Sequence, residues 1–106
     1  MEIIDLESVA KKEIVPGYDA KFVHSKNMTI AYWEVKAGSK LSSHSHVHEQ
    51  VSQVTEGEFE LTVEDKVYVL KPGKIAIIPS NTMHSGVAIT NCKITDTFYP
   101  LRKDYM

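Results

Sequence analysis

Short stretches in which apolar and polar residues alternate recur along this chain. In the clearest, residues 58–64, Phe59, Leu61 and Val63 are each flanked by glutamate or threonine. A period of two residues is typical of a strand that buries one face and exposes the other to water. Similar short runs, from which we predict further strands, occupy residues 28–35, 67–70, 74–78, 83–89 and 92–98.

Turn-forming residues separate these predicted strands. Many short strands joined by turns predict an all-β sandwich or barrel. Only residues 1–15 could hold a helix, and Pro16 followed by Gly17 would end it. The turn signals, which contain glycine, proline, serine or asparagine, lie at residues 37–39, 56–57, 71–73 and 79–81.

The composition narrows the class of protein. At 106 residues, 42% of them hydrophobic, the chain is expected to form one domain, residues 1–106, with a single core. Lysine plus arginine (12) nearly balance aspartate plus glutamate (14), so nucleic acid is not an expected partner. The chain shows no membrane-spanning stretch and no signal-peptide pattern, which predicts a cytoplasmic protein without a membrane partner. The lone Cys92 agrees with a reducing compartment.

Four of the five histidines lie in two places, which indicates a metal site. His44, His46 and His48 fall within five residues, and His84 follows some forty residues later. Imidazole is a common ligand of divalent transition metals, and side chains at i and i+2 of a strand share one face. The alternative is that a histidine-rich run forms a solvated loop. The remaining histidine, His24, is expected to be structural or exposed.

The histidines and the glycine, proline and glutamine residues around them form two motifs with defined spacing. The first has five residues between Gly38 and His44, one between His44 and His46, three before Gln50 and six before Gly57. The second has five residues between Gly73 and Pro79 and four before His84. This layout resembles the cupin family over roughly residues 28–99.

The cupin resemblance implies a fold, a cofactor and a partner. The fold is a double-stranded β-helix, a jelly-roll-like barrel, with a core of about residues 28–99 and short extensions at both ends. Small cupins often pair, so a homodimer is implied. The cofactor is one divalent transition metal, and nickel, zinc, manganese and iron all suit it. The implied metal ligands are His44, His46, Gln50 and His84.

Gln50 stands where cupins usually carry an acidic ligand. Without a carboxylate, the ligands leave the charge of the ion uncompensated, so the site should favour an anionic substrate. Glu49 is a poorer ligand candidate because strand parity turns it away from the face of His44, His46 and Gln50. His48 has no place in the motif, and we expect it to support the site or lie at its rim.

The C-terminal strand adds a second set of candidate residues. Cys92, Ile94, Asp96 and Phe98 share one face by parity, and Asp96 is the polar member of that face. A carboxyl facing a barrel interior has a raised pKa, in the range useful for proton transfer. The alternative is a structural hydrogen bond, or an ion pair with Arg102.

Pro100 ends strand pairing, so Arg102 could fold back over the mouth of the barrel. Its guanidinium would bind a substrate carboxylate in a bidentate manner, whereas the alternative is an ordinary surface arginine. Residues 103–105 are expected to form a solvated tail.

Together, the histidine-rich motif and the sequence Asp-X-Phe-X-Pro-X-Arg-X-Asp-Tyr, which begins at Asp96, are similar to the KdgF family of pectin-degradation cupins. That family linearises unsaturated uronate monomers and binds its metal through three histidines and a glutamine. The resemblance implies that Asp96 is the acid/base group and that Phe98 and Arg102 bind the anionic sugar. Two alternatives stay open: a dioxygenase that uses iron or copper, and a module that binds a sugar acid without converting it.

Overall fold

The structure, a computed structural model, describes residues 1–106 and consists almost entirely of strands. Two 3-10 helices, η1 (Leu6–Ser8) and η2 (Lys103–Tyr105), lie near the termini, and no helix is long and apolar enough to cross a bilayer. The strands are β1 (Lys12–Val15), β2 (Tyr18–His24), β3 (Thr29–Val35), β4 (Lys40–His44), β5 (Glu49–Glu56), β6 (Phe59–Val63), β7 (Lys66–Leu70), β8 (Ile75–Ile78), β9 (His84–Ala88) and β10 (Cys92–Tyr99).

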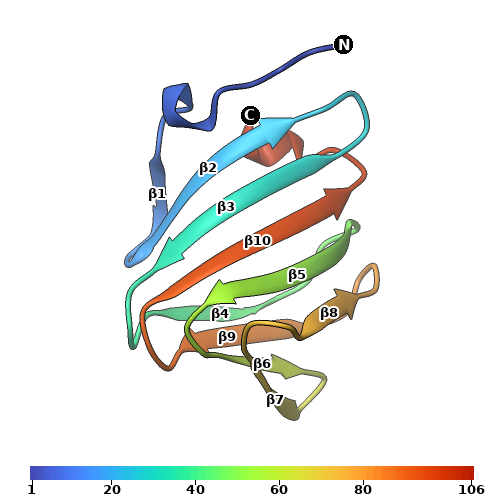
Figure 1. Cartoon of the computed structure of the whole chain (residues 1–106). Coiled ribbons are helices and arrows are strands. Elements are labelled where there is room, and N and C mark those ends of the chain that lie inside the picture. Colours follow the sequence, from blue (N-terminus) through green and yellow to red (C-terminus); the bar gives the residue numbers. More distant parts are fainter.

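The strands form two antiparallel sheets that face each other (Figure 1). One sheet has the order β1-β2-β3-β10-β5-β8, and the other has the order β4-β9-β6-β7. Neighbouring strands are often distant in sequence, so the chain crosses repeatedly between the layers, as in a jelly roll. The predicted all-β class and jelly-roll-like barrel are confirmed, and every predicted run is a strand.

The core fills the space between the two sheets. Alternate residues of β2, β3 and β10 point inward, as the period of two requires. Their apolar side chains meet those of β6 from the opposite sheet. The buried hydrophobic residues are Tyr18, Ala20, Phe22, Ala31, Trp33, Val35, Val54, Phe59, Leu61, Leu70, Ile78, Ala88, Cys92, Ile94 and Phe98.

The N-terminal segment differs from the predicted helix. Residues 1–15 contain only the single turn η1, in which Asp5 Oδ1 accepts a hydrogen bond from the Glu7 backbone N–H at 3.1 Å, followed by the edge strand β1. Pro16 and Gly17 do not end a helix but form the two-residue turn that joins β1 to β2. Gly17 has φ +83°, the left-handed value that a type II turn requires after proline.

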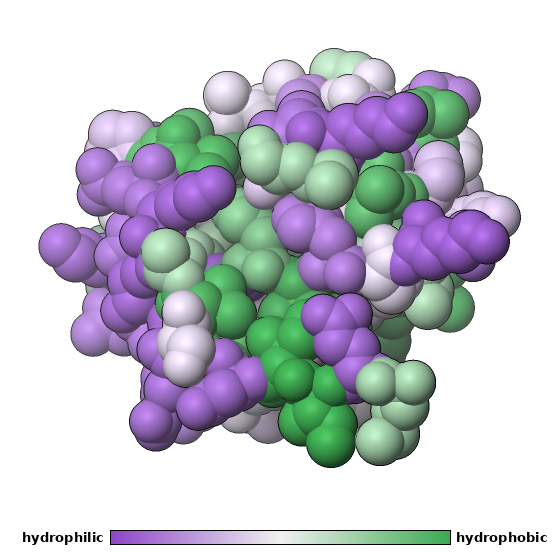
Figure 2. All heavy atoms as spheres, turned by 90° about the horizontal axis from the view of Figure 1, so that it is seen from above, coloured by the Kyte–Doolittle hydropathy of each residue, from purple (hydrophilic) through white to green (hydrophobic).

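The outer face of the six-stranded sheet carries an apolar row. The register aligns Val23 with Ile30, Ile30 with Thr97, Thr97 with Val51 and Val51 with Ile77, across five neighbouring strands. Ile77, on the edge strand β8, is 67% exposed. Seen from above, hydrophobic residues form a strip that reaches one edge of the molecule between hydrophilic residues (Figure 2).

Candidate metal centre and ligand cavity

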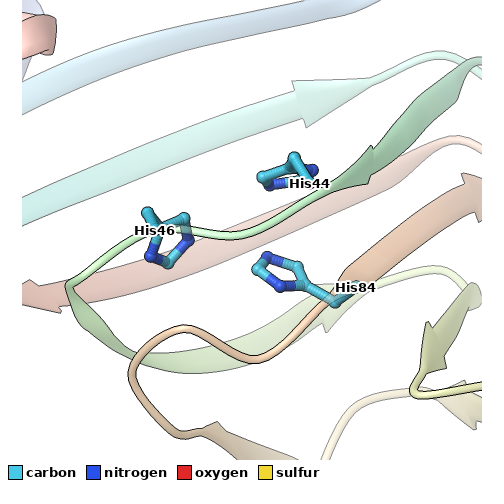
Figure 3. Close-up of side chains that lie close together, drawn as sticks. All are labelled: His44, His46 and His84. Atoms are coloured by element: carbon cyan, nitrogen blue, oxygen red, sulfur yellow. The ribbon is translucent and has the colours of Figure 1, made fainter.

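Three histidines converge at one end of the barrel (Figure 3). His44 is the last residue of β4, His46 lies in the turn after it, and His84 is the first residue of β9. One ring nitrogen of each lies within 4.8 Å of the others. His44 and His84 are also register partners across the β4–β9 pair. The prediction that His44 and His46 share the face of one strand is wrong, because β4 ends at His44 and His46 lies in the loop that follows.

Backbone carbonyls fix the tautomer of all three rings. Nδ1 of His44 donates to the Ser42 carbonyl at 2.7 Å, and Nδ1 of His84 donates to the Thr82 carbonyl at 2.9 Å. Nδ1 of His46 donates to the His48 carbonyl at 2.9 Å. With the proton held on Nδ1, each Nε2 carries a free lone pair. This is the arrangement in which a histidine is prepared to bind a metal through Nε2.

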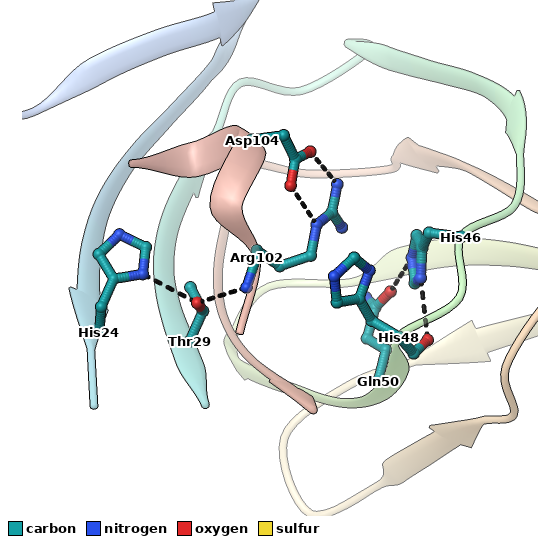
Figure 4. Close-up of polar contacts among 7 residues, drawn as sticks. All are labelled: His24, Thr29, His46, His48, Gln50, Arg102 and Asp104. Carbon is teal, nitrogen blue, oxygen red and sulfur yellow. Dashed lines mark hydrogen bonds and ion pairs between the residues drawn. The ribbon is translucent and has the colours of Figure 1, made fainter. Parts of the chain in front are cut away.

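Gln50 adds an oxygen to the cluster. It lies on β5 with 8% of its surface exposed, and its Oε1 is 3.1 Å from Nε2 of His46 (Figure 4). Glu49 is exposed and points away, as parity predicts. Nε2 of His46 and Oε1 of Gln50 are then both acceptors and cannot hydrogen-bond to each other. The contact is favourable if the Gln50 amide rotates to present its NH2 group, or if one cation binds both atoms. Three imidazoles and an amide oxygen therefore fit a divalent transition metal.

Burial of the site favours the neutral form of two of its imidazoles, His46 and His84. Burial, assisted by the charge of Arg102, lowers the pKa of His46 to about 4. Burial also lowers the pKa of His84. Metals bind neutral imidazole, so protons compete weakly for these two ring nitrogens at neutral pH.

A cavity of about 140 Å³ lies beside the histidine cluster. Strand register places Asp96 of β10 between Ala31 of β3 and Ser52 of β5, all facing inward. Two small neighbours leave space around the carboxyl, which explains why the cavity forms at this level of the barrel. Residues of both proposed sets line it: His44, His46, Gln50, His84, Asp96, Phe98 and Arg102.

Asp96 is the buried carboxyl of this cavity, 8% exposed. Burial raises its pKa to about 6, although polar groups of Ser52, Gln50 and Trp33 oppose the shift. Its Oδ1 has no hydrogen-bond partner. Of the two structural alternatives, the ion pair with Arg102 does not hold, because the Arg102 side chain donates its hydrogen bonds to Asp104. A carboxyl with these properties can accept and return a proton near neutral pH.

Arg102 folds back against the barrel, as predicted, and is not a surface arginine. It is 8% exposed and lines the cavity. Its Nε and Nη2 donate to the two carboxylate oxygens of Asp104, at 3.0 and 2.6 Å (Figure 4). This ion pair lowers the pKa of Asp104 and, against the effect of burial, raises the pKa of Arg102.

The predicted solvated tail is wrong for Tyr105, whereas Lys103 and Asp104 are exposed as predicted. The Tyr105 ring stacks on Phe22 at 4.4 Å between centroids and meets the edge of Trp33 at 6.2 Å. Residues 103–105 thus form a turn whose aromatic member is anchored to the core. Sequence reasoning also missed Trp33 and Ser52 as cavity residues. Ser52 could have been found from the sequence, because it lies two residues after Gln50 and residues at this spacing on a strand face the same side.

The two other histidines lie outside the cluster. His24 Nδ1 is 2.8 Å from Thr29 Oγ1, and its ring stacks on Phe22, so it is structural. The His48 ring lies 5.5 Å from His46 and 6.5 Å from Phe98, between centroids, and its Nδ1 is buried without a partner. Its carbonyl holds the His46 ring, so His48 supports the cluster through its backbone.

Comparison with known families agrees with this architecture. A family model described as a cupin domain matches residues 31–98, more than half of the chain. The chain belongs to the cupin family. This cupin is 34% identical over 65 residues to the pectin degradation protein KdgF of Dickeya dadantii (strain 3937). The match covers 59% of this chain and 59% of that relative, so the chain spans about three fifths of the relative's length.

Two solved structures match this cupin over its whole length, and a third shares the fold over part of it. KdgF from Halomonas sp. superimposes with a TM-score of 0.92 at 26% identity, covering 100% of this chain and 99% of that chain. An RmlC-like cupin from Shewanella frigidimarina NCIMB 400 gives 0.93 at 27% identity, covering 100% and 96%. Salicylate 1,2-dioxygenase from Pseudoaminobacter salicylatoxidans gives 0.77 at 19% identity, covering 81% and 27%, and shares the fold. This cupin is therefore similar to KdgF proteins in both sequence and fold.

In the metal-free protein, His46 and Asp96 should have opposing effects on acid stability. The pKa of His46 is depressed from 6.5 to about 4, so the unfolded chain binds its proton first and the free energy of unfolding falls as pH drops between these values. The pKa of Asp96 is raised from 3.8 to about 6, so the folded protein binds its proton first and the free energy of unfolding rises as pH drops.

The Asp96→Asn variant loses only the second effect. We expect its melting temperature, measured by calorimetry on chelator-treated protein, to fall more steeply between pH 6.5 and 4 than that of the native protein. Equal slopes for the two proteins would contradict the raised pKa of Asp96.

Proposed function

We propose that this cupin opens cyclic 4,5-unsaturated uronate monomers, products of pectin or alginate breakdown, to the linear 5-keto form. The observation that carries the proposal is Asp96, a buried carboxyl with a free oxygen in a small cavity between the histidine cluster and Arg102. The similarity to KdgF proteins supports it. The site thus combines a proton carrier, a cation and a metal-binding cluster.

We further propose that His44, His46, Gln50 and His84 hold one divalent transition metal. Nickel, zinc, manganese and iron all suit three neutral imidazoles and an amide oxygen. When bound, the metal supplies Lewis acidity and a template that orients the oxygens of the substrate. The ring-opening reaction involves no redox change, so several metals could support it.

Asp96 has two tasks in this reaction. As the carboxylate, it accepts the proton of the anomeric hydroxyl while the bond between C1 and the ring oxygen breaks, which makes C1 an aldehyde. The electron pair released to the ring oxygen forms the C5 carbonyl, and the C4–C5 double bond becomes nucleophilic at C4. Asp96 then gives its proton to C4, so the carboxylate is regenerated and atoms and charge balance.

Arg102 and Phe98 would hold the substrate for this transfer. Arg102 is the cationic side chain that lines the cavity, and a guanidinium binds a carboxylate through two parallel hydrogen bonds. Phe98 is 2% exposed and offers an apolar surface against the sugar ring. Binding at both groups would fix the distance between the anomeric hydroxyl and Asp96, which is the main contribution of positioning to the rate.

The test is the loss of ultraviolet absorbance of a lyase-derived unsaturated uronate monomer, which disappears as the double bond is consumed. The rate is compared with the spontaneous opening of the same monomer without protein. Acceleration by the metal-loaded protein is expected. If the metal-loaded protein does not accelerate ring opening, the proposal is refuted. Oxygen consumption with iron or copper would then indicate a dioxygenase, and saturable binding without product would indicate a sugar-acid-binding module.

We also propose that two copies pair through the outer face of the six-stranded sheet. The row from Val23 to Ile77 is apolar except for Thr97, and the face could pack against a copy of itself, as sheets do in sandwiches. Sedimentation is expected to give a dimer that Ile77→Lys weakens. Ile89→Lys, which charges an exposed isoleucine away from the row, should leave the dimer intact. A native monomer would refute the pairing.

A further inference from the structure

Two of the last three residues of the chain, Asp104 and Tyr105, contact the Arg102 guanidinium. Asp104 accepts hydrogen bonds from Nε and Nη2, so both of its oxygens are engaged with one side of the guanidinium. An arginine offers five N–H donors, and this pairing leaves three of them for other acceptors. The carboxylate thus occupies one side of the group and leaves the rest available in the cavity that Arg102 lines.

Two aromatic rings restrict the guanidinium further. Its Cζ lies 4.8 Å from the centroid of Phe98 and 4.2 Å from the centroid of Tyr105. The two rings are inclined by 67°, so the guanidinium sits in the corner between them. Both contacts are of the cation–π kind, which is strongest where water is excluded, as around this buried side chain.

The turn that carries Asp104 and Tyr105 is itself anchored at both ends. The Arg102 backbone N–H donates to Thr29 Oγ1 at 2.9 Å, and Thr29 is fully buried. Tyr105 is stacked on Phe22 of the core. Asp104 lies between these anchors, which fix the backbone that presents its half-exposed carboxylate to Arg102.

We propose that Asp104 and Tyr105 are positioning residues that hold Arg102 as a rigid, directional receptor for the carboxylate of an anionic ligand in the cavity. The proposal rests on the proposed function, in which that ligand is a uronate. Rigidity matters because a flexible arginine loses side-chain entropy when it orders around a ligand, whereas this one is already ordered. The C-terminal turn therefore belongs to the ligand-binding site.

The test compares two probes that do not react, galacturonate and its uncharged methyl ester. Titration calorimetry on metal-loaded native protein is expected to show at least about tenfold tighter binding of the acid. In Asp104→Asn, which keeps the shape but removes the charge, this preference should fall to about threefold or less. Asp104→Glu, which restores a carboxylate, should recover most of it. Lys103→Ala changes an exposed neighbour in the same turn and should bind like the native protein.

A purely structural role for Asp104 would lower the melting temperature without changing the ratio of the two affinities. The proposal is overturned if Asp104→Asn keeps the native preference, or if the native protein does not distinguish acid from ester. Catalysis of ring opening is measured separately. If the native protein accelerates ring opening but Asp104→Asn keeps the native preference for acid over ester, the positioning role alone is refuted. If Asp104→Asn loses this preference but the native protein does not accelerate ring opening, the proposed function alone is refuted.

Discussion

Asparagine in place of Asp96 is expected to slow ring opening by about 10²–10⁴-fold, the usual contribution of a positioned general acid–base group. The amide has the shape of the carboxyl but neither accepts the anomeric proton nor returns one to C4. The fold should survive, because a buried carboxyl with a free oxygen contributes little to stability. The measurement is the rate of absorbance loss at saturating substrate, after subtraction of the spontaneous rate.

The matched control is Asp65→Asn. Asp65 is an exposed turn residue with φ +69°, a conformation that asparagine also tolerates, so the same chemical change is made away from the cavity. This control should retain the native rate and the native metal content. Asp96→Asn activity within threefold of native, with metal bound, would rule out Asp96 as the proton carrier.

Replacement of His84 by alanine is expected to remove the metal. His84 is 4% exposed and contributes one of three converging ring nitrogens. Loss of a ligand should weaken metal binding by more than the roughly 100-fold that follows loss of a supporting residue. The measurement is metal content after dialysis, by elemental analysis, together with competition against a chromogenic chelator.

His48→Ala is the control for this prediction. It removes a histidine from the same run, but the contact of His48 with the cluster is made by its backbone carbonyl, which alanine keeps. Metal content should therefore stay within about threefold of native. Circular dichroism below the melting temperature checks that both variants are folded. Equal metal loss in both variants, or in neither, would refute the assignment of ligands.

The strands that sequence reasoning missed show where hydrophobic periodicity fails. On β5 the inward residues are Gln50, Ser52 and Val54, so two of the three positions that face the interior are polar. The alternation is hidden because this strand carries the site rather than the core. β2 has a clear pattern, with Tyr18 among its buried residues, and was discoverable from the sequence alone.

The candidate site was predictable from motif spacing but its geometry was not. Spacing placed the three histidines and Gln50 together although His46 lies outside any strand. Parity correctly placed Asp96 inside the barrel, because buried and more exposed residues alternate along the whole of β10. The partner of Arg102 could not be read from parity, since Asp104 belongs to a turn whose direction depends on the anchoring of Tyr105 to the core.

The two halves of this site come from separate parts of the chain. The proposed metal ligands come from residues 44–50 and His84, whereas the proposed proton carrier, Asp96, and the cation, Arg102, lie on β10 and in the turn after it. Substitutions in the final dozen positions can therefore replace the acidic and cationic side chains that face a ligand. The histidines and Gln50 would stay unchanged. A single barrel of this kind can diversify in evolution, or in the laboratory, by rewriting one terminal segment.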